Sequence, residues 1–187
     1  MRRVQSSSAG CLRSFPERKH DHEVRQCRRA SLMAWLVLRP CRRACLAHAS
    51  RLQARLGVTP TLAVVLVGDN PASRVYVKSK SRQATAAGIA AIDHRFPATV
   101  SGTELLARIR QLNADSSVHG ILVQLPLANH IRAAEVLRAI DPSKDVDGFH
   151  PVNVGLLASG DAERGFVPCT PLGCLFLLRE RYPASRG

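Results

Sequence analysis

Runs of apolar residues alternate with helix-like repeats over residues 46–182. The run at 62–67 consists only of hydrophobic side chains, which is typical of a strand buried on both faces. Two further runs, at 89–95 and 120–125, predict a second and a third strand. Because helical repeats join these strands through short connections, the pattern predicts an α/β fold, with a parallel sheet flanked by helices.

The helix expected after the first strand covers residues 72–87. Either Asp69 or Asn70 is suited to cap this helix, and Pro71 fits its first turn. The other predicted helices cover residues 47–56, 101–113, 131–140 and a segment that begins at Thr170-Pro171.

Three polar side chains lie along one side of the helix expected at 72–87. Ser73, Tyr76 and Lys80 are separated by three and four residues, which places them on the same side of a helix. This side begins at the carboxyl end of a parallel strand, where open α/β sheets hold their ligands. The pattern predicts either a binding site in which the phenol stacks on a flat heterocycle, or a solvated lysine without a function.

Two later stretches contain further candidate site residues. Gln124 ends an otherwise apolar strand, and a buried amide there needs hydrogen-bond partners, either in a loop backbone or in a site. Asp145 and Asp147 lie in a predicted turn, where an Asp-Gly pair is often only turn chemistry. Two carboxylates at this spacing, without another acidic cluster, do not favour a metal site.

These stretches also carry a resemblance to a known family. Gly120-Ile-Leu-Val-Gln-Leu-Pro-Leu127, Asp145-Val-Asp-Gly-Phe-His-Pro151 and Pro168-Cys-Thr-Pro-Leu-Gly173 closely resemble signature segments of the methylenetetrahydrofolate dehydrogenase / methenyltetrahydrofolate cyclohydrolase family. The family pattern S-x-x-Y-V-x-x-K is matched by residues 73–80, on the first long helix after the first strand. Four motifs in the right order are more specific than any one of them, and the resemblance runs from about residue 52 to about residue 181.

The resemblance implies a role for each candidate residue. Tyr76 is expected to stack on the folate ring, and Lys80 to act in acid/base catalysis at the methenyl carbon. Gln124 is expected to face Lys80 and orient it. Asp147 is expected to accept hydrogen bonds from the amino-pyrimidine edge of the pterin, which suits the two oxygens of a carboxylate. Ser73 is expected to make a secondary polar contact with the substrate.

The resemblance also implies an activity in folate one-carbon metabolism. Members of the family oxidise 5,10-methylenetetrahydrofolate with NADP and hydrolyse the methenyl product to 10-formyltetrahydrofolate. Their second domain binds NADP through a Gly-rich loop, but no G-x-G-x-x-G occurs in this sequence. We therefore expect residues 46–182 to form the tetrahydrofolate-binding catalytic domain, with the Rossmann-type domain missing and residues 183–187 as a truncated tail. A full-length protein is expected to be a homodimer, in the cytoplasm rather than in mitochondria.

Residues 1–45 do not show the pattern of a domain. The net charge of +13 is concentrated in this part, since residues 1–55 hold 13 Lys and Arg against 3 Asp and Glu. The usual first motif of the family is not found here, so this basic leader is expected to be disordered or not the natural start of the chain. Its apolar run at 32–38 is too short to cross a bilayer, which takes about 20 residues.

Two alternatives to the enzyme stay open. The chain is also compatible with a non-catalytic fragment that binds folate. A basic nucleic-acid-binding protein acting through residues 1–55 is the second alternative, although that segment lacks interleaved aromatic side chains for stacking on bases. Zinc is not expected at Cys41 and Cys45, because no second ligand pair has suitable spacing. Cys169 and Cys174 are expected to be ordinary thiols.

Overall fold

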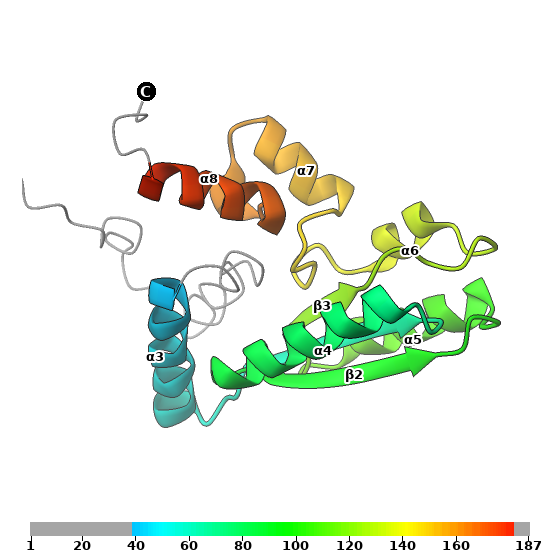
Figure 1. The fold of residues 1–187 in the computed structure, drawn as a ribbon, viewed down its shortest axis with the longest axis horizontal. Coiled ribbons are helices and arrows are strands. Elements are labelled where there is room, and N and C mark those ends of the chain that lie inside the picture. Colours follow the sequence, from blue (N-terminus) through cyan, green and yellow to red (C-terminus); the bar gives the residue numbers. More distant parts are fainter. Residues whose placement is uncertain (1–38, 182–187) are drawn as a thin grey trace, which may run out of the picture.

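The computed structural model describes residues 39–181 of the 187-residue chain, and the expectations for residues 1–38 and 182–187 lie outside the described residues. As predicted, the described chain is an α/β fold, in which a parallel sheet is flanked by helices (Figure 1). The strands are β1 (Thr61–Val67), β2 (Ala90–Phe96) and β3 (Gly120–Val123). The helices are α3 (Arg39–Leu56), α4 (Pro71–Ala86), α5 (Gly102–Ala114), α6 (Ala133–Ala139), α7 (Pro151–Ala158) and α8 (Cys169–Arg181), with a short 3-10 turn η1 (Ala162–Arg164).

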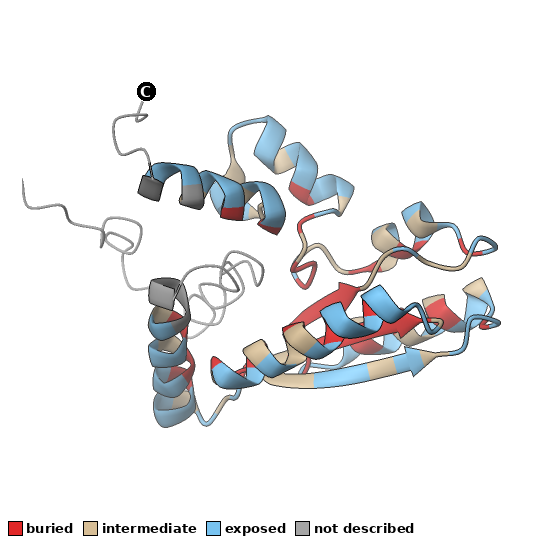
Figure 2. Cartoon of the chain, viewed as in Figure 1, coloured by how far each residue is buried: buried red, intermediate tan, exposed pale blue. Residues whose placement is uncertain are grey.

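The sheet has the order β2-β1-β3, so β1 lies between two parallel neighbours. Alternate side chains of a strand point to opposite faces of its sheet. The odd-numbered residues from Ala63 to Val67 pack against α5, β3 and α6, and the even-numbered residues from Leu62 to Leu66 pack against α4 and Cys45 of α3. Because both faces of β1 are covered, its central residues are all apolar (Figure 2).

Asn70, and not Asp69, caps helix α4. The Oδ1 atom of Asn70 accepts hydrogen bonds from the backbone N–H groups of Ala72 and Ser73, at 2.9 and 3.2 Å. Pro71 occupies the first helical position, where a missing N–H costs nothing. The cap therefore fixes where α4 leaves the carboxyl end of β1, and with it the start of the predicted site.

Helix α5 follows the capping-box pattern of the sequence at its start. The hydroxyl of Ser101 accepts a hydrogen bond from the backbone N–H of Glu104 at 3.1 Å. Leu106, whose apolar side chain would suit the buried stripe, is only partly buried at the edge of the core. The buried stripe of α5 consists of Leu105, Ile109 and Leu112.

Strand β3 is shorter than the sequence predicts. It ends at Val123, although the apolar run continues to Leu125. The backbone N–H of Gln124 still donates to the carbonyl of Val65 at 2.8 Å, but Pro126 has no N–H with which to continue the ladder. Gln124 and Leu125 therefore belong to the loop after the strand, where their polar groups are available to a site.

Helix α6 is also shorter than expected, because the two isoleucines at its predicted ends are not helical. The N–H of Ile131 closes a turn on the carbonyl of Ala128, and Ile140 is extended. Both isoleucines are buried in the core. Their burial, which the sequence pattern shows, does not require them to lie within the helix.

The two outer helices begin earlier than predicted. Helix α3 starts at Arg39 instead of residue 47, and so runs across the domain boundary expected after residue 45. Cys45, Ala49 and Leu52 are buried at helical spacing, which explains why the helix extends toward the N-terminus. Helix α8 starts at Cys169, so Thr170 is its second residue and not its cap.

Residues 39–181 contain neither a membrane-spanning helix nor a cluster of metal-binding side chains. No helix in this range combines the length and the apolar character needed to cross a membrane. Within the same residues, no group of three or more His, Cys, Asp and Glu side chains is arranged to hold a metal ion.

Candidate functional site

Helix α4 supplies three of the predicted site residues. Ser73 and Lys80 are each 4% exposed, and they share the buried stripe of the helix with Val77 and Ala84. Tyr76 is 57% exposed. At 3.6 residues per turn it lies about 60° around the helix from Ser73. The three side chains are therefore neighbours, as the spacing predicts, but Tyr76 is exposed while Ser73 and Lys80 are covered.

The amine of Lys80 reaches the loop that follows β3. Its Nζ atom donates a hydrogen bond to Oε1 of Gln124 at 3.2 Å. The Nε2 atom of Gln124 donates to the carbonyl of Leu125 at 2.7 Å, which leaves the amide oxygen turned toward α4. The contact expected between Lys80 and Gln124 is thus present, although they lie far apart in the sequence. Its role in catalysis stays a prediction.

The two carboxylates of the loop after α6 have different surroundings. Asp145 is 2% exposed, and its Oδ2 atom accepts hydrogen bonds from the backbone N–H of His150 and from Nδ2 of Asn153, at 2.8 and 2.9 Å. It also forms a bridge to Ile121 on β3. Asp145 therefore holds the loop together from inside, and Asp147 is the carboxylate that is left for a ligand.

Asp147 is a partly buried carboxyl group between a cation and a thiol. Burial raises the pKa of Asp147 above its ordinary value, because a charged carboxylate is poorly solvated there. The charge of Lys80 and a hydrogen bond from the Cys169 thiol oppose this rise in pKa, and the nearby Asp145 adds to it. The Sγ atom of Cys169 lies 3.5 Å from Oδ1 of Asp147. The carboxyl group predicted to anchor a pterin is thus close to the amine predicted to act in catalysis.

A buried cation beside this loop has a structural use that the sequence did not reveal. The Nζ atom of Lys144 donates to the carbonyls of Leu112, Asn113 and Asp115, at 3.0, 2.7 and 2.7 Å. These carbonyls end helix α5 and lack partners within the helix. Because Lys144 is far from α5 in the sequence, only the fold shows that it caps this helix.

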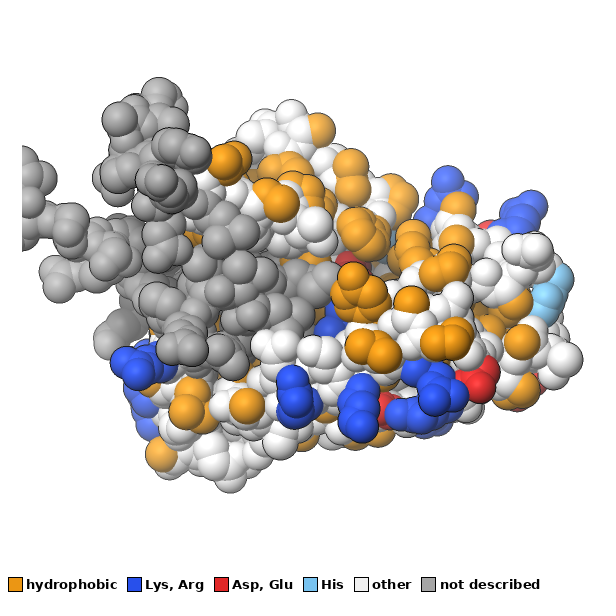
Figure 3. Space-filling view, viewed as in Figure 1, with side chains coloured by type: hydrophobic (Ala, Val, Ile, Leu, Met, Phe, Trp, Pro, Cys, Tyr) orange, Lys and Arg blue, Asp and Glu red, His pale blue; other side chains and the backbone are white. Residues whose placement is uncertain are grey.

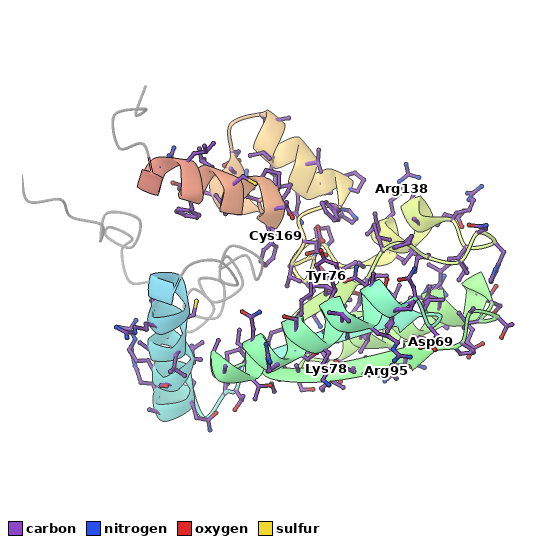
Figure 4. All side chains as sticks on the ribbon, viewed as in Figure 1. Asp69, Tyr76, Lys78, Arg95, Arg138 and Cys169 are labelled. Atoms are coloured by element: carbon purple, nitrogen blue, oxygen red, sulfur yellow. The ribbon has the colours of Figure 1, made fainter. Side chains whose placement is uncertain are left out.

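Cys169 is the site neighbour that sequence reasoning missed, since the sequence pointed only to an ordinary thiol. It is 2% exposed, at the first position of α8. The signal that could have found it was its place in the Pro168–Gly173 motif, for which the resemblance supplied no role. In Figure 4, Tyr76 lies on the side of α4 that faces the start of α8, where Cys169 is labelled.

Lys78, an exposed basic residue of α4, lies away from these groups. Tyr76 and Lys78 leave the helix on different sides in Figure 4. The space-filling view shows Lys and Arg side chains along the lower edge of the molecule, while hydrophobic side chains gather above it (Figure 3).

Comparisons with known proteins show which family the sequence matches. The profile of a family described as tetrahydrofolate dehydrogenase/cyclohydrolase, catalytic domain, matches residues 37–147. This match covers more than half of the chain and includes all the predicted site residues, from Ser73 to Asp147. The chain belongs to this family.

The relatives that the chain matches are longer than the chain itself. It is 59% identical over 129 residues to the bifunctional protein FolD 2 of Paracoccus denitrificans, a match that covers 69% of this chain and 42% of the relative. It is 60% identical over 125 residues to FolD 3 of Rhizorhabdus wittichii, which covers 67% and 40% of the two chains. The chain therefore spans less than half the length of these family members.

Two solved structures share the fold of the chain. One is the bifunctional methylenetetrahydrofolate dehydrogenase/cyclohydrolase of Campylobacter jejuni, with a TM-score of 0.75 at 46% identity over 80% of this chain and 52% of that one. The other is the Trypanosoma brucei dehydrogenase-cyclohydrolase, complexed with NADP and an inhibitor. Its TM-score is 0.71 at 34% identity, over 75% of this chain and 48% of that one.

The described residues do not fit a dinucleotide in the manner of a Rossmann domain. The strand-to-helix turn from β1 to α4 is the place where such a phosphate loop would lie. There the side chain of Asn70 already accepts the N–H groups of Ala72 and Ser73, and Pro71 has no N–H to offer. The sequence has no G-x-G-x-x-G either. No step that uses NADP is therefore assigned to these residues.

Proposed function

We propose that residues 39–181 contain the tetrahydrofolate site of a bifunctional methylenetetrahydrofolate dehydrogenase / methenyltetrahydrofolate cyclohydrolase. The observation that carries the proposal is the hydrogen bond between Lys80 and Gln124, with the carboxyl group of Asp147 close to the same lysine. An amine, an amide and a carboxylate from three separate segments meet beside an exposed aromatic ring. Family membership gives this cluster its substrate class, a reduced folate.

In the proposed complex, the exposed ring of Tyr76 stacks on the folate, and Asp147 accepts two N–H bonds from the amino-pyrimidine edge. Ser73 is a secondary polar contact. These groups hold the methenyl carbon near Lys80. The hydrogen bond to Gln124 fixes the orientation of the Lys80 amine. Positioning of this kind accounts for a large part of the rate enhancement that enzymes achieve.

The proposed reaction in this half of the protein is hydrolysis. Water adds to the methenyl carbon of the cationic substrate and loses a proton, and Lys80 is the group that moves this proton. The hydroxyl group of this adduct then loses its proton and becomes the formyl carbonyl, while the bond from that carbon to N5 breaks and N5 takes up a proton. The formyl group stays on N10. The overall change consumes one water and releases one proton, as the conversion of the methenyl cation to 10-formyltetrahydrofolate requires.

We propose the oxidation of 5,10-methylenetetrahydrofolate for the whole protein, with NADP as oxidant. The Trypanosoma brucei relative supports the choice of cofactor, since its structure holds NADP. A cytoplasmic homodimer is the proposed state of the whole protein. In this proposal the described residues contribute the folate site, and a separate domain of the whole protein binds the dinucleotide.

Hydrolysis of 5,10-methenyltetrahydrofolate, followed by the loss of its absorbance, tests the proposal. We expect Lys80→Ala to reduce the rate at least 100-fold, since a positioned acid/base group contributes about 10²–10⁴-fold. Binding of tetrahydrofolate to this variant is expected to stay within about threefold of the wild type. Lys78→Ala is the matched control, because Lys78 is an exposed lysine on the same helix.

The possible results separate the proposed enzyme from the alternative of a non-catalytic folate-binding fragment. Turnover by the wild type that is lost in Lys80→Ala supports the enzyme. A shift in ligand absorbance without turnover in the wild type favours the fragment. Wild-type turnover by Lys80→Ala would show that the assignment of the acid/base group is wrong.

A further inference from the structure

The Pro168–Gly173 motif has no role in the proposed mechanism, yet it places a thiol against the carboxyl group of Asp147. The Sγ atom of Cys169 lies 3.5 Å from Oδ1 of Asp147, and the thiol is the hydrogen-bond donor. Cys169 is 2% exposed, so water does not compete freely for this contact. A carboxylate that accepts a hydrogen bond from a buried donor has its side-chain direction restricted.

The backbone around Asp147 holds this contact in place. Gly148 has φ +70, and a Cβ atom added there would lie 2.7 Å from the backbone N of Pro168 and 2.8 Å from the carbonyl carbon of Val167. The loop that carries Asp147 therefore lies directly against the residues that precede Cys169. Only a glycine permits both the positive φ and this close approach.

A buried asparagine ties the same two segments together. The Oδ1 atom of Asn153 accepts the N–H of Phe166 at 3.2 Å, and its Nδ2 atom donates to Asp145 at 2.9 Å. Asn153 is 2% exposed, at the third position of α7. Through these bonds Asn153 connects the loop of Asp147 with the segment that precedes Cys169.

The ionisable groups that act on Asp147 come from three parts of the fold. Lys80 on α4 and the thiol of Cys169 on α8 lower the pKa of Asp147, and Asp145 of the same loop raises it, together with burial. Lys80 is already engaged with Gln124. The thiol is therefore the hydrogen-bond donor to Asp147 that has no other role in the proposed mechanism.

We propose that Cys169 is a positioning residue for Asp147: its thiol holds Oδ1 and keeps the carboxylate ionised and directed toward the amino-pyrimidine edge of a bound tetrahydrofolate. This inference rests on the proposed function, because it concerns how the predicted pterin anchor is presented. A carboxylate oxygen has two lone pairs, so one bond from Cys169 leaves acceptor capacity for the ligand. Cys169 itself takes no part in the chemical step.

Two measurements on the 187-residue chain test the inference. The first is the titration of the Asp147 carboxyl group, followed by carbon NMR without ligand. Without the donor we expect Cys169→Ala to move the titration midpoint upward by about half a pH unit. The second is the binding of tetrahydrofolate as a function of pH. We expect Cys169→Ala to bind tetrahydrofolate about fivefold more weakly near neutral pH, which is the effect of a modest hydrogen bond. We also expect the pH below which binding fails to rise by the same half unit as the titration midpoint.

Three further variants distinguish positioning from a merely structural role. In Cys169→Ser a hydroxyl replaces the thiol as donor, so both the titration midpoint and the affinity are expected to return close to the wild type. Cys174→Ala removes an exposed thiol from the same helix, and Cys45→Ala removes a buried thiol from α3. Neither control is expected to change the titration of Asp147, whereas urea denaturation reports any loss of stability separately.

The two measurements fail in distinguishable ways. If the titration of Asp147 is the same in the wild type and in Cys169→Ala, the thiol does not hold the carboxylate and the inference is overturned. If that titration shifts while the wild type binds no tetrahydrofolate, the contact stands and the folate role falls together with the proposed function. A shift accompanied by weaker binding, with recovery in Cys169→Ser, supports both.

Discussion

Gly148 is the residue on which the geometry of the predicted site depends most closely. It follows Asp147 directly, and its backbone lies against the segment that leads into α8. A side chain at this position would push the loop of Asp147 away from Cys169. The requirement for glycine thus comes from two sources, a positive φ and a lack of space.

We expect Gly148→Ala to lower the free energy of unfolding by about 3 kcal/mol. About 1–2 kcal/mol is the usual cost of a left-handed conformation for an L-residue, and the clash with Pro168 and Val167 adds to it. Gly160→Ala is the matched control, because Gly160 has φ +81 but a Cβ atom added there would meet nothing within 4 Å. Urea denaturation of both variants measures the difference, and equal losses would show that the close approach at Gly148 is not important.

At the scale of single elements, the start of α4 determines where Ser73, Tyr76 and Lys80 are placed. Asn70 accepts two of the N–H groups that the first turn leaves without partners. Asp69, one residue earlier, is instead paired with Arg74 on the surface. Asn70 and Asp69 are neighbours in sequence, but we expect them to contribute different amounts to the stability of the fold.

We expect Asn70→Ala to cost about 1 kcal/mol of stability, the typical loss of an N-cap side chain. Asp69→Ala should cost clearly less, because an exposed ion pair contributes little. Thermal unfolding of the two variants gives the comparison. If Asp69→Ala proved the more damaging change, the assignment of the cap to Asn70 would be wrong.

The sequence predicted those elements whose signal is local. β1 was found because its run of apolar side chains is covered on both faces, and α5 because Ser101 and Glu104 mark its start. The ends predicted for β3 and α6 were wrong, because tertiary contacts and not the local sequence pattern position Gln124 and Ile140.

The arrangement of the candidate site residues was predicted only in part, because most of their contacts join segments that are distant in sequence. The contact between Lys80 and Gln124 was expected only because the motifs resemble those of a family. Spacing on one helix cannot show which strand end faces it. The contacts of Cys169 with Asp147 and of Lys144 with the end of α5 join segments that are distant in sequence, and no local pattern reports them.

At the scale of the whole molecule, His94 is the group through which we expect the stability of the fold to depend on pH. Burial lowers the pKa of His94 below its ordinary value, and the neighbouring Arg108 lowers it further, while Asp93 opposes the shift. Arg108 on α5 also contacts Nδ1 of His94 at 3.1 Å, which joins this helix to the edge strand β2. The folded chain therefore favours the neutral imidazole.

We expect the chain to lose stability as pH falls from about 6.5, because the unfolded state binds a proton on His94 that the folded state resists. Above that pH neither state binds the proton, so the contribution is constant. In His94→Gln, the free energy of unfolding should fall by less between about pH 7.5 and about pH 5.5 than it does in the wild type. Urea denaturation at the two pH values measures it, and an identical loss in both proteins would exclude His94 as the cause.

If the described residues form a folate site anchored by Asp147, the dissociation constant for tetrahydrofolate must depend on that carboxylate. We expect the 187-residue wild type to bind, Asp147→Asn to bind roughly tenfold more weakly or worse, and Asp69→Asn to be unchanged. The loss in Asp147→Asn follows from replacing an acceptor-only carboxylate by an amide whose N–H₂ opposes the pterin donors. Equal affinity of Asp147→Asn and the wild type, or no binding by the wild type, would contradict the account.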